Sequence, residues 1–359
     1  MEVRKSTLEG MVTMQNILIT GNLGYIGPIM TKTLKNAGFL VTGMDANWFK
    51  GCCLFPLADN HLPNKQIYKD IRQAREEDLD NIDAVIHLAA LSNDPLGELN
   101  HALTDEVNFK STIHLAELCK KRAVKKFIFA SSCSVYGIAK TDSPIGEEDA
   151  LNPITAYAKA KINSEAGLHR LADANFHPVF LRNATVYGAS PKTRLDLVVN
   201  NLTAYAYLLK EITILSDGSP WRPIVHIEDF CQAFLLCLKA PIEKIHCQAF
   251  NVGDNTQNFR VRDIANEINK LLPDSQIIVK NETGSDERSY RVDFSKIKRE
   301  IPEFEAKWTL INGIKQLIKI YKEQNLTLEG FNSERFFRIR TIKSLISSGC
   351  LNTSLIALK

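Results

Sequence analysis

Short apolar runs alternate with stretches of helical periodicity along the first half of the chain. A run of roughly four to eight apolar residues between polar or glycine-rich stretches is typical of a buried strand. By this criterion, strands are predicted at residues 16–20, 39–44, 83–90, 126–130 and 178–182. Apolar side chains at helical spacing predict helices at residues 25–37, 99–122 and 153–174. Buried strands that alternate with helices of this length predict an α/β fold with a doubly wound parallel sheet.

The alternation becomes less regular after Tyr187. Helices are predicted there at residues 194–210, 261–272 and 309–324, with short strands at 212–215, 222–226 and 250–252. From this change we predict two folded units, preceded by a leader and followed by a tail. The sheet domain is expected at residues 14–186, with residues 226–255 returning to it, and a smaller C-terminal α/β substrate lobe at residues 187–225 and 256–330. Residues 1–13 are expected to be a disordered leader, and residues 331–359 a basic helical tail.

The tail repeats apolar residues along one helical face. Its stripe consists of Phe336, Ile339, Ile342, Leu345 and Ile346. Such a stripe is typical of a helix that packs on its own protein. We therefore expect the tail to pack against the rest of the chain.

Composition narrows the classes of function. Hydrophobic residues make up 45% and charged residues 24% of the 359 residues, which is typical of a globular protein. The formal net charge of +3 is too small for a general nucleic-acid binder. No apolar run reaches the length of a membrane span, and the N-terminus has no secretory core. The eight cysteines lack Cys-x-x-Cys spacing, so we expect no metal site, and we expect buried thiols in a reducing cytoplasm.

A glycine-rich turn joins the first predicted strand to the first predicted helix. Its residues are Gly21, Asn22, Leu23, Gly24, Tyr25, Ile26 and Gly27, in the pattern GxxGxxG. Small residues let a pyrophosphate approach backbone amides at the N-terminus of a helix, where the helix dipole favours anions. Asp45 ends the second strand, where a carboxylate accepts the ribose hydroxyls of NAD and repels the extra phosphate of NADP. The pattern predicts an NAD site.

Two later strand ends are expected to touch the same cofactor. His87-Leu88-Ala89-Ala90 ends the strand at 83–90, and its small residues let the backbone pass close to a ligand. Asp70 and Ile71 follow a third strand and are predicted to contact adenine. The expected cofactor-binding residues here are therefore Asp70, Ile71, Leu88, Ala89 and Ala90.

Tyr157 and Lys161 lie four residues apart in a predicted helix and so share one face. A tyrosine is a poor base at neutral pH, because its ordinary pKa is about 10. A nearby ammonium favours the phenolate, and the same lysine can hold a cofactor ribose. Tyr157 and Lys161 are therefore also expected cofactor-binding residues. Ser132 follows the strand at 126–130, so its hydroxyl is expected to face the same cleft.

The order of these motifs resembles a known family. GxxGxxG, Asp45, HLAA, SSCSVYG at 131–137, YxxxK and LRNATVYG at 181–188 follow one another as in the extended short-chain dehydrogenases/reductases. More narrowly, residues 15–328 resemble the NAD-dependent nucleotide-sugar epimerase/dehydratase family. The resemblance implies a Rossmann-type sheet, NAD as cofactor and a nucleotide-diphosphate sugar as substrate. It also implies that Ser132 binds the reacting hydroxyl, Tyr157 removes its proton and Lys161 tunes Tyr157.

The positions before Val135-Tyr136 divide the family chemically. Its 4,6-dehydratases and related decarboxylases usually place Glu two residues before that tyrosine, and the dehydratases often add Asp before it. Cys133 and Ser134 stand here, which disfavours 4,6-dehydration. Cys133 is expected to be a packed thiol. The expected catalytic groups that remain are one hydroxyl, one tyrosine, one lysine and a bound NAD. They predict epimerisation of the sugar at C4 through a transient ketone, with a 4-dehydrogenase or reductase as the alternative.

Arginines of the second lobe are the expected contacts of the substrate diphosphate, because guanidinium forks match phosphate oxygens. Arg222 and Arg288 are the main candidates and Arg194 a weaker one. The other expected substrate-binding residues are Ser92, Ser132, Ser134 and Thr185. His226 is expected to pack rather than to act in catalysis. A homodimer is expected, with no nucleic-acid or membrane partner.

Overall fold

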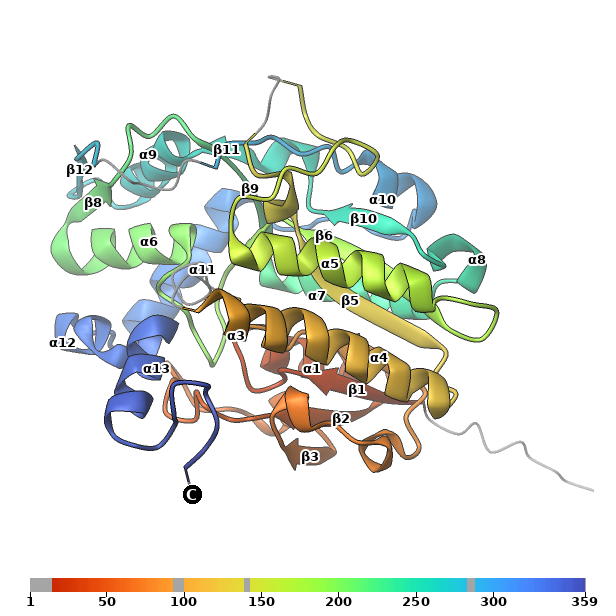
Figure 1. The fold of residues 1–359 in the computed structure, drawn as a ribbon. Coiled ribbons are helices and arrows are strands. Elements are labelled where there is room, and N and C mark those ends of the chain that lie inside the picture. The colour runs from red at the N-terminus through yellow and green to blue at the C-terminus, as the bar shows by residue number, and fades with distance from the viewer. Residues whose placement is uncertain (1–14, 93–99, 139–142, 283–287, 359) are drawn as a thin grey trace, which may run out of the picture.

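The computed structural model describes residues 15–92, 100–138, 143–282 and 288–358, so the expected leader at 1–13 lies outside the described residues. A parallel seven-stranded sheet forms its centre (Figure 1). The spatial order of the strands is β10 (Ala249–Val252), β6 (His177–Asn183), β5 (Lys126–Ser132), β4 (Ala84–His87), β1 (Asn16–Thr20), β2 (Leu40–Asp45) and β3 (Lys65–Tyr68). The doubly wound α/β sheet predicted from the sequence is confirmed.

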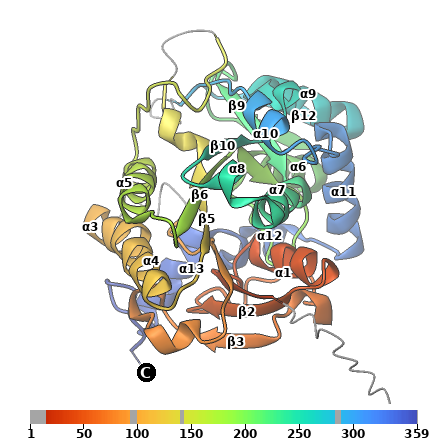
Figure 2. The same cartoon turned by 90° about the vertical axis from the view of Figure 1, so that its right-hand side faces the viewer.

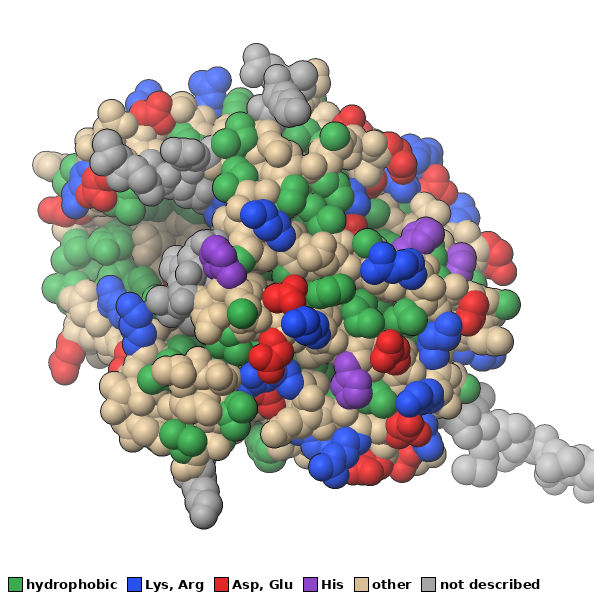
Figure 3. Space-filling view, in the orientation of Figure 1, with side chains coloured by type: hydrophobic (Ala, Val, Ile, Leu, Met, Phe, Trp, Pro, Cys, Tyr) green, Lys and Arg blue, Asp and Glu red, His purple; other side chains and the backbone are tan. Residues whose placement is uncertain are grey.

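Helices cover both faces of this sheet (Figure 2). One face carries α3 (His101–Asp105), a π-helical turn at Glu106–Lys110, α4 (Ser111–Lys121) and α5 (Ala156–Leu171). The other carries α1 (Gly27–Asn36) and α7 (Ile227–Lys239). Each face has its own apolar core, one around Leu115 and Phe127 and one around Leu34 and Phe234. Acidic and basic side chains are interspersed over the α4 and α5 face (Figure 3).

Helix α7 is missing from the sequence prediction. Its residues 230–238 are almost continuously apolar, and most of them are buried. A helix buried on most of its circumference lacks the polar face that makes helical spacing easy to recognise. It matters for the fold because it carries the chain from the second lobe back to β10 at the edge of the sheet.

A second group of elements lies beside the sheet. It contains a three-stranded sheet in the order β11 (Asn258–Arg260), β9 (Trp221–His226) and β7 (Thr185–Tyr187), and a parallel pair of β8 (Glu211–Ile214) and β12 (Gln276–Val279). Helices α6 (Val198–Leu209), α9 (Val261–Leu271) and α11 (Leu310–Glu323) pack on these strands around a third apolar core. The smaller helices α8 (Ile242–Ile245) and α10 (Ser295–Glu300) belong instead to the main sheet, where they pack on β6 and β10. The short strands β7, β11 and β12 were not predicted.

The C-terminal tail folds back across both parts. It contains α12 (Leu328–Asn332), a 3-10 turn at Glu334–Phe336 and α13 (Arg338–Ser347). Phe336 belongs to the core of the second group of elements, whereas Ile342 and Leu355 belong to the core on the α4 face of the sheet. The predicted packing of the tail on its own protein is confirmed. Within the described ranges, no helix has the length and hydropathy to cross a membrane.

Candidate active site

One cavity of about 750 Å³ lies along the carboxyl ends of the parallel strands. Its wall includes Gly21 after β1, Asp45 at the end of β2, Leu88 after β4, Ser132 at the end of β5 and Asn183 at the end of β6. The carboxyl ends of parallel strands are where open α/β sheets bind their ligands. The fold therefore brings residues at the ends of five strands to one cavity.

The glycine turn forms the floor of this cavity. Gly21 has φ +74°, and a Cβ at this position would lie 2.8 Å from the backbone nitrogen of Ala89. Only glycine lets the two chain segments approach so closely. Gly24, Tyr25 and Ile26 also line the cavity, and the turn leads directly into α1.

Three residues of the turn do not line the cavity. The Asn22 side chain turns away and donates to Oε1 of Gln66 at 2.7 Å, and Leu23 and Gly27 are buried. The backbone N–H of Leu23 donates to Oδ2 of Asp45 at 3.0 Å, so Asp45 supports the turn. The expected cofactor contacts of Asn22, Leu23 and Gly27 are therefore not found in the cavity wall, because these residues hold the turn in shape from behind.

Asp45 lies at the strand end where the sequence predicts the carboxylate that favours NAD over NADP. Its Oδ1 accepts from the Asn47 backbone at 2.6 Å. Burial raises the pKa of Asp45, whereas its two backbone hydrogen bonds and the charges of Lys192 and Arg338 lower it. These two cations therefore lie within electrostatic range of Asp45, a feature that the sequence reasoning did not anticipate.

The other predicted cofactor residues also reach the cavity. The set that lines it consists of Asp70, Ile71, Leu88, Ala89 and Ala90. Both oxygens of Asp70 are engaged by Arg72, with Nη2 at 2.6 Å from Oδ2. The Asp70 carboxylate is therefore held at the rim by an ion pair.

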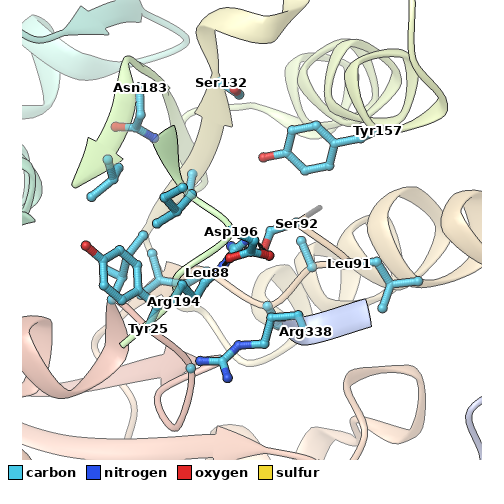
Figure 4. Close-up of a pocket in the computed structure, with 18 of the residues that line it drawn as sticks. Tyr25, Leu88, Leu91, Ser92, Ser132, Tyr157, Asn183, Arg194, Asp196 and Arg338 are labelled. Atoms are coloured by element: carbon cyan, nitrogen blue, oxygen red, sulfur yellow. Dashed lines mark hydrogen bonds and ion pairs between the residues drawn. The ribbon is translucent and has the colours of Figure 1, made fainter. Parts of the chain in front are cut away.

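Tyr157 and Lys161 project from α5 toward the cavity, and Ser132 approaches from β5 (Figure 4). Thr155 caps this helix and accepts from the N–H of Ala158 at 3.2 Å. The ammonium of Lys161 lies 5.5 Å from the Tyr157 ring centroid and donates to the Ala130 carbonyl at 2.6 Å. Burial lowers the pKa of Lys161 to about 7. A lysine so placed favours the phenolate of Tyr157 whenever it is protonated.

A buried ion pair behind the cavity was not predicted. Arg182 on β6 binds Glu165 on α5, with Nη2 at 2.7 Å from Oε2. The Ser131 hydroxyl donates to the same carboxylate at 2.5 Å. The pair joins β5, β6 and α5, so it helps to fix Tyr157 and Lys161 against Ser132.

All the expected substrate-binding residues line this one cavity: Ser92, Ser132, Ser134, Thr185, Arg194, Arg222 and Arg288. Arg194 forms a buried ion pair with Asp196 at 2.9 Å and donates to the Ser92 hydroxyl at 3.1 Å. Arg222 donates to the backbone carbonyls of Trp221 and Arg288. The second lobe therefore presents three guanidinium groups to the space in front of the sheet.

Cys133 and His226 lie outside the cavity wall, as expected for packed side chains. The Cys133 thiol is fully buried, donates to the Arg182 carbonyl at 3.2 Å, and has a pKa well above its ordinary value because of burial. The His226 ring stacks on Trp308 at 3.8 Å between centroids. Neither side chain faces the space in which a substrate would bind.

Sequence reasoning missed several lining residues. Asn183 lies within the LRNATVYG motif, and its buried Oδ1 has no hydrogen-bond partner among the described residues. Phe337, Arg338 and Ile339 come from the tail. Asn183 could have been predicted from the sequence, because it belongs to a motif. The tail residues could not, because they follow the region that resembles the family.

Comparison with known proteins agrees with this geometry. The NAD dependent epimerase/dehydratase family matches residues 17–253. An uncharacterized UDP-glucose epimerase, YtcB, of Bacillus subtilis is 30% identical over 63% of this chain and 73% of its own. The solved structure of an NAD-dependent NDP-hexosamine 5,6-dehydratase, TunA, is 25% identical with a TM-score of 0.76, covering 86% of this chain and 98% of that one. UDP-glucose 4-epimerase of Thermotoga maritima, with UDP-glucose, is 25% identical with a TM-score of 0.75, covering 87% and 100%. The chain belongs to the NAD dependent epimerase/dehydratase family, and it is an NAD-dependent enzyme of the nucleotide-sugar type.

Proposed function

We propose that the protein epimerises a nucleotide-activated sugar at C4 through a transient 4-keto sugar. The observation that carries this proposal is the set of acid–base groups in the cavity. Ser132, Tyr157 and Lys161 are present, and the carboxylates among the described lining residues are Asp45, Asp70 and Asp196, each already bound to a cation or to backbone amides. Oxidation and reduction at C4 need only the first three groups. Loss of water from the sugar needs a further acid and base.

The cavity fits NAD on two counts. Gly21 and Gly24 offer backbone that a side chain would otherwise cover, next to the N-terminus of α1. Asp45 stands at the end of β2, where a ribose hydroxyl can be accepted. When bound, NAD takes a hydride from the sugar carbon and can return it. The protein residues supply the proton transfer and the orientation.

Tyr157 is the base in this proposal. Its phenolate would accept the proton of the C4 hydroxyl, which the Ser132 hydroxyl holds in place by a hydrogen bond. The Lys161 ammonium, fixed on the Ala130 carbonyl, favours the phenolate by its charge. Epimerisation then requires the ketone to present its opposite face, and Arg222 and Arg288 are placed to hold the diphosphate meanwhile.

A labelling experiment tests the proposal. UDP-, GDP-, CDP- and dTDP-sugars are first screened for a new product, and the active sugar is then prepared with deuterium at C4. A 4-epimerase returns the label to the same carbon, so we expect the product to retain deuterium with no net NADH absorbance. Tyr157→Phe serves as the inactive control.

The alternative is a 4-dehydrogenase or reductase of the same substrates, because the same three groups serve both reactions. Stoichiometric release of NADH, or transfer of the label into an added NAD pool, would establish this alternative. Movement of the label from C4 to another carbon of the sugar would instead indicate dehydration.

Two finer expectations belong to the same proposal. All eight cysteines are free thiols, which supports a reducing compartment such as the cytoplasm. The homodimer stays a prediction, and light scattering on the purified protein checks it.

A further inference from the structure

The tail contributes a wall to the cavity at a junction of three chain segments. We call this the tail junction, and it consists of residues 48–54, 190–196 and 335–341. Hydrogen bonds join these segments. Arg335 Nη2 donates to the Cys53 carbonyl at 2.6 Å, and Leu195 N donates to the Phe336 carbonyl at 3.0 Å. Arg338 Nη2 donates to the Lys192 carbonyl at 2.9 Å, and Lys192 Nζ donates to the Phe49 carbonyl at 2.9 Å. The junction holds the start of α13 at the cavity, beside the segment that follows β2 and Asp45.

Arg338 is the residue of the junction with unused binding capacity. Its side chain is only 4% exposed, and its guanidinium stacks over the Phe49 ring at 4.4 Å. Nη1 is buried and has no hydrogen-bond partner among the described residues. Figure 4 shows the side chain running from the start of α13 beneath Asp196 and Arg194, with the guanidinium directed toward the side where Tyr25 lies. An unsatisfied guanidinium N–H on a residue of the cavity wall would gain a hydrogen bond to a ligand acceptor that reaches it.

Charge around Arg338 is unbalanced. Arg194 is neutralised by Asp196, whereas Lys192 and Arg338 donate to carbonyl groups and form no ion pair among the described residues. Burial and the nearby Arg194 guanidinium lower the pKa of Arg338 to about 10, so it stays protonated at neutral pH. Asp45 is the carboxylate on which the charges of both Lys192 and Arg338 act, so two cations share one anion. A bound anion would balance the remaining positive charge.

The nearest part of the expected ligand is the dinucleotide. Arg338 stacks on Phe49, which follows Asp45 in the chain and lines the same cavity, and Asp45 accepts from the amide of Leu23 in the glycine turn. Arg338 therefore shares this part of the cavity wall with the turn whose form suits a pyrophosphate. We propose that the tail residue Arg338 is a cofactor-binding residue, whose guanidinium binds a phosphate oxygen of the NAD diphosphate and closes the site from the side opposite the glycine turn.

This inference extends the NAD site beyond the motifs of the family. The family match ends at residue 253, and the motif resemblance ends near Leu328, so neither includes Arg338. It rests on NAD binding and is independent of the proposed chemistry at C4. A site closed by the tail would also hold the cofactor through many turnovers, which suits an enzyme that returns its hydride to the same molecule.

The test measures ligand binding to the full-length protein by titration calorimetry, with NAD, ADP-ribose, adenosine and UDP as separate probes. In Arg338→Met, we expect the affinity for NAD and ADP-ribose to fall about 10- to 100-fold, as for the loss of a charged hydrogen bond. Adenosine carries no phosphate, so its affinity should not change. The matched control is Arg340→Met, because Arg340 lies in the same helix, stacks on Phe337 and is absent from the cavity wall.

Thermal unfolding supplies a second readout. Without NAD, Arg338→Met is expected to melt at the wild-type temperature or above, since it removes an unpaired buried cation. With NAD, its gain in melting temperature should be smaller than that of the wild type. A purely structural arginine would instead give a less stable protein and weaker binding of every probe, adenosine included.

Three results would overturn the proposal. The first is an unchanged NAD affinity in Arg338→Met, and the second is an equal loss of affinity for adenosine. The third is a loss of affinity for UDP alone, which would assign Arg338 to the substrate. If the methionine variant fails to fold, Arg338→Lys replaces it. Lysine keeps the charge without the planar fork, so NAD affinity should still fall several-fold while adenosine affinity is unchanged. None of these measurements needs turnover, so their failure leaves the C4 proposal standing, and the deuterium experiment does not test them.

Discussion

The two ends of the cavity are built in different ways. At the catalytic end, Ser132, Tyr157 and Lys161 come from one strand and the helix that follows it. At the tail junction, the contacts join residues 282 and 289 positions apart, as between Arg335 and Cys53 or Cys52 and Thr341. Proton transfer needs groups at fixed spacing on rigid elements, whereas a closing cation can come from any segment that reaches the site. Local sequence patterns therefore reveal the residues expected to transfer protons, but they do not reveal a residue that closes the cavity.

The largest effect is expected at the catalytic end, where one substitution should lower kcat and leave the affinity for NAD unchanged. Tyr157→Phe should lower kcat by roughly 10²–10⁴-fold, because the base is lost. NAD affinity should stay near the wild-type value, because the cavity keeps its shape. Steady-state kinetics and calorimetry on the same preparation check both parts. A large loss of NAD affinity in this variant would mean that the Tyr157 hydroxyl is itself needed to hold the cofactor, and the separation of turnover from cofactor binding would fail.

The second prediction concerns the selectivity for NAD at Asp45, beside the tail junction. Asp45 should repel the extra phosphate of NADP, so the wild type is expected to bind NAD roughly tenfold or more tightly than NADP. Asp45→Asn should reverse much of this preference, since Lys192 and Arg338 remain beside the site. Asp70→Asn is the matched control, because Asp70 lines the same cavity but is neutralised by Arg72. Equal affinities for NAD and NADP in the wild type would refute the assignment of Asp45.

The third prediction uses the buried lysine of the catalytic end. The folded-state pKa of Lys161 is lowered to about 7 from 10.5, so between these values the unfolded chain binds more protons than the folded one. The free energy of unfolding therefore gains a contribution that rises with pH by up to ~1.4 kcal/mol per pH unit. Urea unfolding without cofactor should show this rise in the wild type relative to Lys161→Met.

Lys159→Met is the control for this experiment, because Lys159 is exposed on the same helix. It should keep the wild-type pH dependence. Identical slopes in the wild type and Lys161→Met would show that Lys161 keeps its ordinary proton affinity in the folded protein.

The smallest effect is expected at Cys133. Its thiol is buried behind the cavity wall, so Cys133→Ala should change kcat by less than about threefold, apart from a modest loss of stability. Activity measured well below the melting temperature separates the two effects. A loss comparable to that of Tyr157→Phe would indicate a second acid–base step and would exclude simple 4-epimerisation.

The sequence by itself determined the sheet and most of the catalytic end. Runs such as residues 16–20 and 126–130 are apolar because both faces of a parallel strand are covered, and this leaves a local signal. Tyr157 and Lys161 were found because helical spacing fixes which side chains share a face. Gly21 was found because a tight turn at a phosphate site excludes side chains.

Only the tertiary structure decided which residues complete the cavity. Asn22 has the right position in the turn but binds Gln66, and helix α7, which is mostly apolar and has only a narrow polar stripe, was not recognised from its pattern. Arg338 lies far along the chain from every motif, and its burial, its hydrogen bond to the Lys192 carbonyl and its stacking on Phe49 all depend on how the tail packs. Local patterns follow from the geometry of single strands and helices. The cavity wall contains both the glycine turn near the N-terminus and the C-terminal tail. Their meeting depends on long-range packing, which has no fixed spacing in the sequence.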